Sequence, residues 1–324
     1  MKRAILLTAS AMAVGICLPV WLMGRPNSVA QETTGTTAAP QTTAYVQETT
    51  SPTEPARSLQ VLKPTGVEEL ELETYLTGVL LAEMPTSFQP EALKAQAVVA
   101  RTYTLRRTSH PKHDNADVCT DSNCCQGWID PEIYEDAAGL EAARQAVQET
   151  KGEVLTYGGD LIDATFFSAS GGRTEAAAEV WGGDVPYLQS VESPGEESPY
   201  EEDQVVYSLE EFRKLILEAA PEADLSGAPE TWFQNVQATE GGGVESLQVG
   251  GVSFTGTTLR SVLKLRSTVF SVSVTEDEIF IDTKGFGHRV GMSQYGAEAM
   301  AEKGSTYKEI LYHYYQGVTL EEYS

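Results

Sequence analysis

The strongest constraint on the fold is a break at Pro85, inside a region that otherwise favours helix on both sides. Apolar residues recur at helical spacing between residues 70 and 82, and an alanine-rich segment runs from Pro90 to about Arg107. Proline has no N–H and restricts the residue before it, so the first helix must end just before Pro85. The sequence therefore predicts two consecutive helices joined by a short turn, with Glu83 at the end of the first.

Glu83 is a candidate general acid because of this placement. The C-terminal end of a helix dipole disfavours a negative charge, which raises the pKa of a carboxyl group there. A raised pKa suits a group that must donate a proton near neutral pH. From the residues alone, the alternative is an ordinary surface glutamate at a helix end.

The charge of the chain narrows the class of partner. The 324 residues carry a formal net charge of −25. A nucleic-acid-binding protein needs a basic face, so nucleic acid is excluded as a partner. An anionic polymer would have to be held by local contacts, because the overall field of the protein repels it.

The N-terminal part predicts an anchor and a tether. Residues 1–25 begin with Lys2-Arg3 and continue with an uncharged run up to Gly24, long enough to span a membrane. A cleaved signal peptide is the competing interpretation. Residues 26–58 are rich in Thr, Ser and Pro and predict a disordered linker with a reach of about 30 Å. We expect a single-pass membrane protein whose domain, residues 59–324, lies on the extracytoplasmic side.

The remaining pattern predicts an α+β fold, in which helices pack on antiparallel β-hairpins. Glycine turns separate pairs of apolar segments that read as hairpins. The acidic stretch 192–203 reads as a solvated surface excursion. The expected further helices span 131–150, 295–303 and 306–315, and the expected hairpins span 153–167, 244–254 and 269–282.

A cluster of metal-ligating residues follows the alanine-rich helix. His113, Cys119, Cys124 and Cys125 offer one imidazole and three thiolates within a short segment, a set suited to one structural zinc ion. Three cysteines in an exported domain cannot all pair internally. His110 is a spare candidate ligand.

Several motifs resemble the stage II sporulation protein D family of exported lytic transglycosylases from spore-forming bacteria. They are Glu83-Met84-Pro85, the Arg-Thr-Tyr step at 101–103, the Ser-Gly-Gly loop at 168–175 and the glycine-rich loop at 284–296. In the family, the glutamate of the Glu-Met-Pro step is the catalytic acid/base, so the resemblance implies that role for Glu83. The zinc-bearing branch of the family carries a similar cluster, with a histidine where this chain has Cys124.

The resemblance also implies a glycan groove between the Glu83–Arg101 helix pair and the 285–296 loop. Arg101 would hold the lactyl carboxylate of muramic acid, and a structural salt bridge is the alternative. The remaining expected substrate-binding residues are Ser168, Ser170, His288, Gln294 and Tyr295. A tight turn is the alternative for the serine loop, and a structural role is the alternative for His288. Trp181 would either stack on a sugar or lie in the core.

The implied activity is cleavage of peptidoglycan glycan strands, after removal of their stem peptides, to give 1,6-anhydromuramic ends during sporulation and engulfment. The implied partners are a cell-wall amidase and a membrane scaffold of the engulfment complex. The alternative function is a non-catalytic, glycan-binding enhancer of an amidase. A zinc amidase is disfavoured, because four protein ligands leave no position for a water molecule on the metal.

Overall fold

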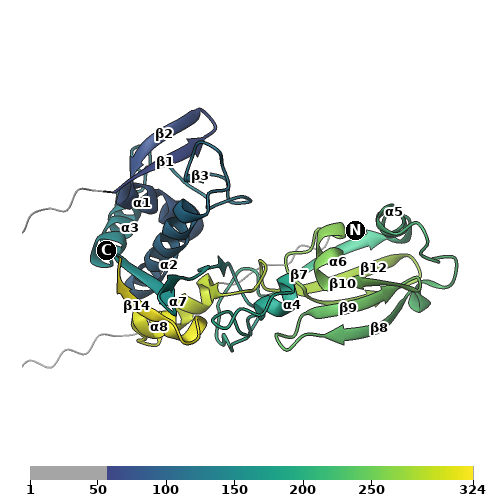
Figure 1. Ribbon diagram of the computed structural model, residues 1–324. Helices are drawn as coiled ribbons and strands as arrows, with labels where there is room; N and C mark the ends of the chain where they lie inside the picture. Colours follow the sequence, from purple (N-terminus) through teal and green to yellow (C-terminus); the bar gives the residue numbers. More distant parts are fainter. Residues whose placement is uncertain (1–56, 324) are drawn as a thin grey trace, which may run out of the picture. The chain divides into compact units, whose positions relative to one another are not determined.

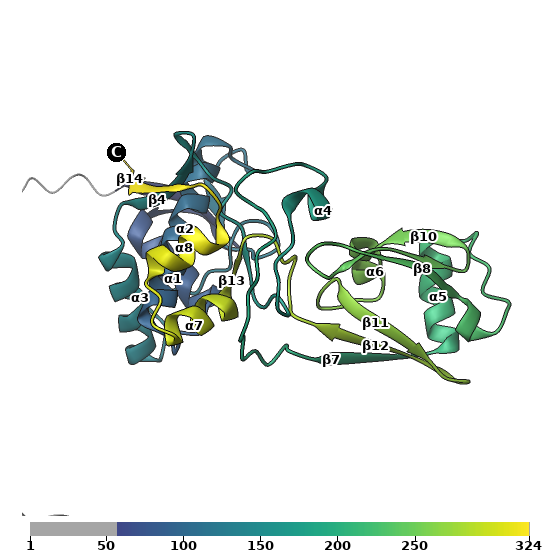
Figure 2. The same cartoon turned by 90° about the horizontal axis from the view of Figure 1, so that it is seen from below.

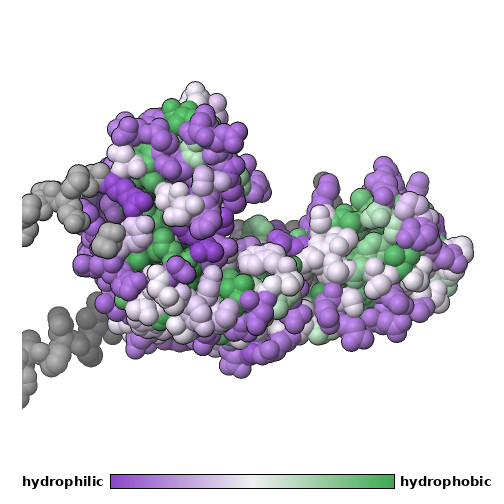
Figure 3. Space-filling model, in the orientation of Figure 1, coloured by the Kyte–Doolittle hydropathy of each residue, from purple (hydrophilic) through white to green (hydrophobic). Residues whose placement is uncertain are grey.

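The computed structural model describes residues 57–323, and this part of the chain is a mixed α+β protein (Figure 1). The predicted anchor, and the predicted linker up to residue 56, lie outside the described residues. Among the helices that are described, none is long and apolar enough to cross a membrane. The face seen in Figure 3 is mostly hydrophilic, in keeping with the high net charge.

The described part contains eight α-helices and fourteen strands. The helices are α1 (Leu72–Glu83), α2 (Pro90–Ser109), α3 (Ala137–Glu149), α4 (Ala177–Trp181), α5 (Leu209–Ala219), α6 (Gly256–Val262), α7 (Gln294–Glu302) and α8 (Tyr307–Tyr314). The strands are β1 (Ser58–Lys63), β2 (Gly66–Glu71), β3 (Val118–Cys119), β4 (Glu153–Tyr157), β5 (Asp160–Leu161), β6 (Phe166–Phe167), β7 (Asp203–Ser208), β8 (Phe233–Ala238), β9 (Val244–Val249), β10 (Val252–Thr255), β11 (Val269–Val274), β12 (Glu278–Lys284), β13 (Met292–Ser293) and β14 (Thr319–Glu322).

The helix break at Pro85 is confirmed. Helix α1 ends at Glu83, and α2 starts with Pro90 in its first turn, where the missing N–H costs no hydrogen bond. Figures 1 and 2 both place α7 and α8 beside α2, so the C-terminal helices pack against the helix pair that the sequence predicted. Helix α3 begins at Ala137 and not at Pro131, because the Asp136 side chain accepts a hydrogen bond from Ala138 N–H and caps the helix there.

The sheets are small, and they serve two separate hydrophobic cores. The first core joins α1, α2, α3, α7 and α8 with β1 and β4. The second core is built within residues 203–284, where β10-β9-β8 and β11-β12-β7 form two three-stranded sheets. The hairpins at β9–β10 and β11–β12 are confirmed. The predicted strand 161–167 is instead two short strands with different partners. Strand β5 pairs with β4, whereas β6 pairs in parallel with β13.

Arg101 lies in the first core and not on a surface. Its side chain is fully buried and pairs with Glu73, with Nη2 at 2.7 Å from the carboxylate. The same guanidinium donates to the backbone carbonyls of Val147 and Glu153. The alternative interpretation, a structural salt bridge, is therefore what the structure shows, and it replaces the expected contact with a substrate carboxylate.

The stretch 192–203 is also more than a solvated excursion. Ser193 is buried, and the Glu196 carboxylate accepts hydrogen bonds from the hydroxyl groups of Ser170, Ser193 and Ser293, at 2.7 to 2.8 Å. A half-buried glutamate thus ties three segments together. Sequence reasoning missed this because a local excess of acidic residues looks the same whether one carboxylate points inward or all point to solvent.

We expect Arg101→Met to lower the free energy of unfolding by about 3 kcal/mol, because removing one partner of a buried pair leaves the other uncompensated. Urea unfolding followed by circular dichroism measures this. The matched control is Arg144→Met, which removes an exposed arginine on α3 and should stay within about 0.5 kcal/mol of the wild type. Equal stability of the two variants would contradict the structural role of Arg101.

Candidate active site and metal centre

Two hollows in the surface of the described chain meet at Glu83. The first has a volume of about 840 Å³ and extends over the end of α2 and the loop before α7. The second has a volume of about 580 Å³ and extends over the turn at Pro85. Both are lined by the same four residues, Glu83, Ser168, Tyr200 and Gln294. The two hollows therefore form arms of one groove, with Glu83 at their junction.

The Glu83 carboxyl group is half-buried at the end of α1. Burial raises its pKa, and a hydrogen bond from Gly127 N–H to Oε1 acts in the opposite direction. Gly127 allows this close approach, since a Cβ atom there would stand only 3.0 Å from Oε1. The helix-end position predicted for Glu83 is confirmed, and burial is the main cause of the raised pKa. Such a group is protonated to a higher pH than an ordinary glutamate.

Gln294 and Tyr295 reach the groove from the start of α7. The Gln294 side-chain amide donates to the backbone carbonyl of Glu83 at 2.9 Å, which fixes the end of α1 relative to α7. Tyr295 N–H donates to the Ser168 carbonyl at 3.0 Å, and its ring packs edge-on against Phe88. The structure thus brings Glu83, Ser168, Gln294 and Tyr295 together as predicted.

Ser170 does not reach the groove. It is fully buried, and its hydroxyl and N–H both donate to the Glu196 carboxylate. Its role is to hold the loop and not to meet a ligand, which corrects the expectation from sequence. Sequence alone could not tell Ser168 from Ser170, because both are serines of one loop and only their contacts differ: Ser168 lines the groove, whereas Ser170 binds Glu196.

His288 lies in the wall of the first hollow, between the rings of Phe167 and Trp181. Burial, reinforced by the positive charge of Arg260, lowers its pKa to about 4. Its Nδ1 accepts a hydrogen bond from Val290 N–H at 3.1 Å. His288 is therefore neutral at physiological pH and is a weak base. Trp181 is 51% exposed, so it is not a core residue.

Sequence reasoning missed two cations of the first hollow, Arg107 at the end of α2 and Lys112 in the following loop. It also missed Gly127, Glu196 and Tyr200. A signal for Gly127 was present, since it lies two residues after Cys125 and so belongs to any loop that the cysteines fix. Nothing in the sequence placed the cations near Glu83.

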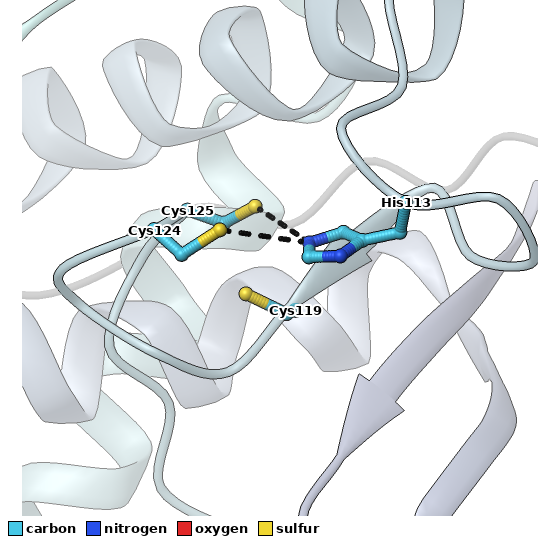
Figure 4. Close-up of side chains that lie close together, drawn as sticks. All are labelled: His113, Cys119, Cys124 and Cys125. Carbon is cyan, nitrogen blue, oxygen red and sulfur yellow. Dashed lines mark hydrogen bonds between the residues drawn. The ribbon is translucent and has the colours of Figure 1, made fainter.

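The predicted metal ligands converge. Figure 4 shows the sulfur atoms of Cys119, Cys124 and Cys125 facing the ring of His113. All four candidate ligand atoms lie within 4.8 Å of one another, and the Cys124 and Cys125 sulfurs lie 3.7 Å and 3.6 Å from His113 Nε2. Ligands of a tetrahedral zinc ion stand about 3.5 to 3.8 Å apart, given bonds of about 2.0 to 2.3 Å. The donor set and its spacing fit one zinc ion.

The protonation state of the cluster depends on whether a cation is bound. Burial raises the pKa of Cys124, and raises that of Cys125 to about 12, so the sulfurs by themselves favour the protonated state. A bound zinc ion stabilises thiolates and reverses this preference. His110 does not belong to the cluster, since its Nδ1 lies 3.4 Å from the Arg106 carbonyl.

The comparisons with known proteins agree with these motifs. The family model described as stage II sporulation protein matches residues 62–157. The chain is 39% identical over 267 residues to the stage II sporulation protein D of Bacillus amyloliquefaciens, a match that covers 79% of this chain and 76% of that protein. It is 36% identical to the protein of that name from Bacillus subtilis, with the same coverage. It is 31% identical to a Bacillus subtilis protein named amidase enhancer, of which it spans 40%.

The fold and site define a class of α+β proteins in which one half-buried glutamate lies in an open groove beside a His/Cys₃ cluster. The match to the two Bacillus proteins extends well beyond this groove, over most of each chain. The chain belongs to the stage II sporulation protein D family.

The zinc site leads to a prediction. We expect the purified full-length chain to carry one zinc ion, and Cys125→Ser to lose it and to melt at a lower temperature, because the ion closes the loop that the cluster spans. Elemental analysis and thermal melting measure both. The control His110→Ala should keep the metal. Protein without zinc, with all four cysteines including Cys17 titratable as thiols, would contradict the assignment.

Proposed function

We propose that this protein is a lytic transglycosylase that cleaves peptidoglycan glycan strands between N-acetylmuramic acid and N-acetylglucosamine. The observation that carries the proposal is the position of Glu83, a carboxyl group with a raised pKa where two arms of a groove meet. A polymer lying along both arms would cross Glu83 at an internal bond. The resemblance of the Glu-Met-Pro step supports the same residue.

The reaction needs one carboxyl group used twice. Neutral Glu83 donates its proton to the glycosidic oxygen as the bond from that oxygen to C1 of muramic acid breaks. The resulting carboxylate accepts the proton of the C6 hydroxyl group of the same sugar, whose oxygen forms the new bond to C1. The products are a 1,6-anhydro end and a free N-acetylglucosamine end, and Glu83 is again protonated. The nucleophile is part of the substrate and is already close to C1, so the reaction needs no bound water molecule as nucleophile.

The other carboxyl groups that line the two arms have structural partners. Asp163 pairs with Arg107 at 3.1 Å, and Asp136 caps α3. Hydrolytic glycosidases use two carboxyl groups, one of which activates water or attacks the sugar. In the described groove, no second carboxyl group stands without such a partner, which favours the single-acid reaction over hydrolysis.

The His/Cys₃ cluster has a structural part in this proposal. When bound, zinc supplies a rigid cross-link between His113 and the cysteine pair, with no open position for chemistry. Cys125 lies two residues before Gly127, whose N–H contacts the Glu83 carboxyl group. The cluster therefore holds in place the backbone group that positions the acid.

We further propose that the protein acts at the cell membrane, anchored by residues 1–25, on the extracytoplasmic side and between the two membranes of a sporulating cell. This rests on the apolar N-terminal run in the sequence. Its partners would be a cell-wall amidase, which removes stem peptides, and a membrane scaffold of the engulfment complex.

A second candidate function is a non-catalytic enhancer of an amidase, which one relative's name suggests. Such a protein needs the groove but not an acid. The raised pKa of Glu83 favours the enzyme, because burying a carboxyl group destabilises the fold without helping a purely binding surface.

We expect Glu83→Gln to abolish the release of 1,6-anhydro ends while glycan binding is retained, because the amide has the same shape and cannot donate an acidic proton. Mass spectrometry of peptide-free glycan strands after incubation measures the product. Binding of labelled strands, measured by fluorescence anisotropy, is the control. Anhydro ends released by the variant at the wild-type rate would exclude Glu83 as the acid.

The raised pKa of Glu83 also predicts a pH dependence of stability. The fold favours the neutral carboxyl group, so the stabilisation is complete below the unfolded pKa of about 4.3 and is lost as the pH rises through the folded pKa. Glu83→Gln, which stays neutral, should therefore be more stable than the wild type at pH 8 and similar to it at pH 4. Urea unfolding at both values measures this, with the exposed Glu276→Gln as control.

A further inference from the structure

We infer that Arg107 and Lys112 bind the lactyl carboxylate of the muramic acid that reacts, and that the strand therefore lies with its muramic acid in the first arm and its leaving sugar in the second. This rests on the proposed function. It makes the groove selective for strands whose stem peptides have been removed, because only these carry a free carboxylate.

The groove differs in charge from the rest of the protein. The chain carries a formal charge of −25, yet the first arm is lined by two cations, Arg107 and Lys112, with Glu83 and Asp163 as its carboxyl groups. Since the proposed acid Glu83 is neutral before reaction, the charged side chains of this arm sum to a positive charge. Among the described residues, no lysine or arginine lines the second arm. The two arms thus have different electrostatic character.

Arg107 retains hydrogen-bonding capacity beyond its ion pair. The Nη2 atom of its guanidinium donates to the Asp163 carboxylate at 3.1 Å. The guanidinium carbon lies over the Tyr103 ring, 4.8 Å from the ring centre. Its Nε is buried and has no hydrogen-bond partner within the described part of the chain. A guanidinium offers five donors, and a carboxylate that approaches the fork can accept from those that Asp163 leaves.

Lys112 is the second cation, and it is exposed at the mouth of the first arm. Its ammonium donates to the Cys124 carbonyl and to the Tyr103 hydroxyl, the latter at 3.4 Å. Within residues 57–323 it has no carboxylate at salt-bridge distance, and unlike the other unpaired lysines it lines the first arm. Lys112 therefore carries a charge that a bound anion can balance.

The chemistry of the strand matches this arrangement. In a peptidoglycan strand, muramic acid carries a lactyl ether that ends in a carboxylate, and a stem peptide converts this group into a neutral amide. The reacting muramic acid must place C1 beside Glu83, which brings its lactyl group into one arm only. The cations place it in the first arm. The leaving N-acetylglucosamine then lies in the second arm, among polar and aromatic residues such as Thr86, Tyr200 and Tyr295.

Orientation and selectivity thus have one cause, a cation pair on one side of the acid. The same residues explain how a strongly acidic protein holds an anionic polymer, because the attraction is local while the overall field is repulsive. The role expected of Arg101 falls to Arg107, six positions later on α2 and on the groove side of the helix.

The test compares two substrates made from one preparation of peptide-free strands. In one half the lactyl carboxylates are left free, and in the other they are converted to methylamides with carbodiimide and methylamine. The full-length wild type, Lys112→Gln, Arg107→Gln and Lys112→Arg are assayed on both for anhydro ends. The matched control is Lys214→Gln, an exposed lysine on α5 away from the groove.

We expect the wild type to show a kcat/KM about tenfold higher on the free-acid strands, the effect of one charged hydrogen bond. The ratio should fall to about one in Lys112→Gln and Arg107→Gln, and should be retained in Lys112→Arg and Lys214→Gln. Equal wild-type rates on the two substrates, or an unchanged ratio in Lys112→Gln, would overturn the inference. Lys112 is exposed, so Lys112→Gln should fold normally. This variant therefore tests the inference even if Arg107→Gln unfolds.

Binding of labelled strands separates this inference from the proposed function. If the wild type cleaves neither substrate but binds the free-acid strands more tightly, and Lys112→Gln loses that preference, the cation pair stands and the lytic reaction fails. If it cleaves neither substrate and binds both equally, the inference fails as well.

Discussion

The hydrogen bond between Gly127 N–H and the Glu83 carboxyl group is the contact on which the groove depends. It joins the end of α1, which Pro85 determines, to the segment that follows the cysteine cluster. Gln294 closes the arrangement from α7 by donating to the Glu83 carbonyl. Three segments far apart in the sequence are thereby held together at one residue, Glu83. A catalytic acid has to be placed to within a fraction of an ångström, and contacts from rigid neighbours achieve this better than a loop alone.

Further polar contacts hold these segments in place. The Glu196 carboxylate accepts from Ser170, Ser193 and Ser293, and Ser293 also caps α7, the helix that presents Gln294 and Tyr295. The buried pair of Arg289 and Glu175, at 2.8 Å, does similar work for the loop that carries His288. Arg289 has a positive φ of 66°, a conformation that disfavours residues with a side chain and that the surrounding contacts must stabilise. Burying such pairs is costly unless every donor is used, and the Arg289 guanidinium also donates to the carbonyls of Ser170, Arg173 and Gly241.

The sequence was sufficient where one local rule decided the outcome. Pro85 fixed the helix end, Gly250-Gly251 fixed the turn of the β9–β10 hairpin, and the spacing of His113 and the three cysteines predicted a cluster that does converge. The sequence was insufficient where the outcome depended on whether a side chain points into the core or into the groove. Arg101 and Arg107 lie on one helix six residues apart, yet one side chain is buried in the core and the other lines the groove. Ser168 and Ser170 differ in the same way although they stand only two residues apart. Helical periodicity orders side chains around an axis, but it does not say which face meets the core until the packing partners are known.

Glu83 and the neighbouring cysteine cluster have opposite effects on the stability of the fold. Burial that raises the pKa of Glu83 opposes folding whenever the group ionises, so the site is a local source of instability. A zinc ion held by His113 and the three cysteines would offset this beside the site, because its binding energy would stabilise the fold that assembles its ligands. The two effects meet in the short segment from Cys125 to Gly127. Glu83 can therefore stay half-buried because it is held from three sides: by the core that packs α1, by Gly127 beside the His/Cys₃ cluster, and by Gln294 of α7.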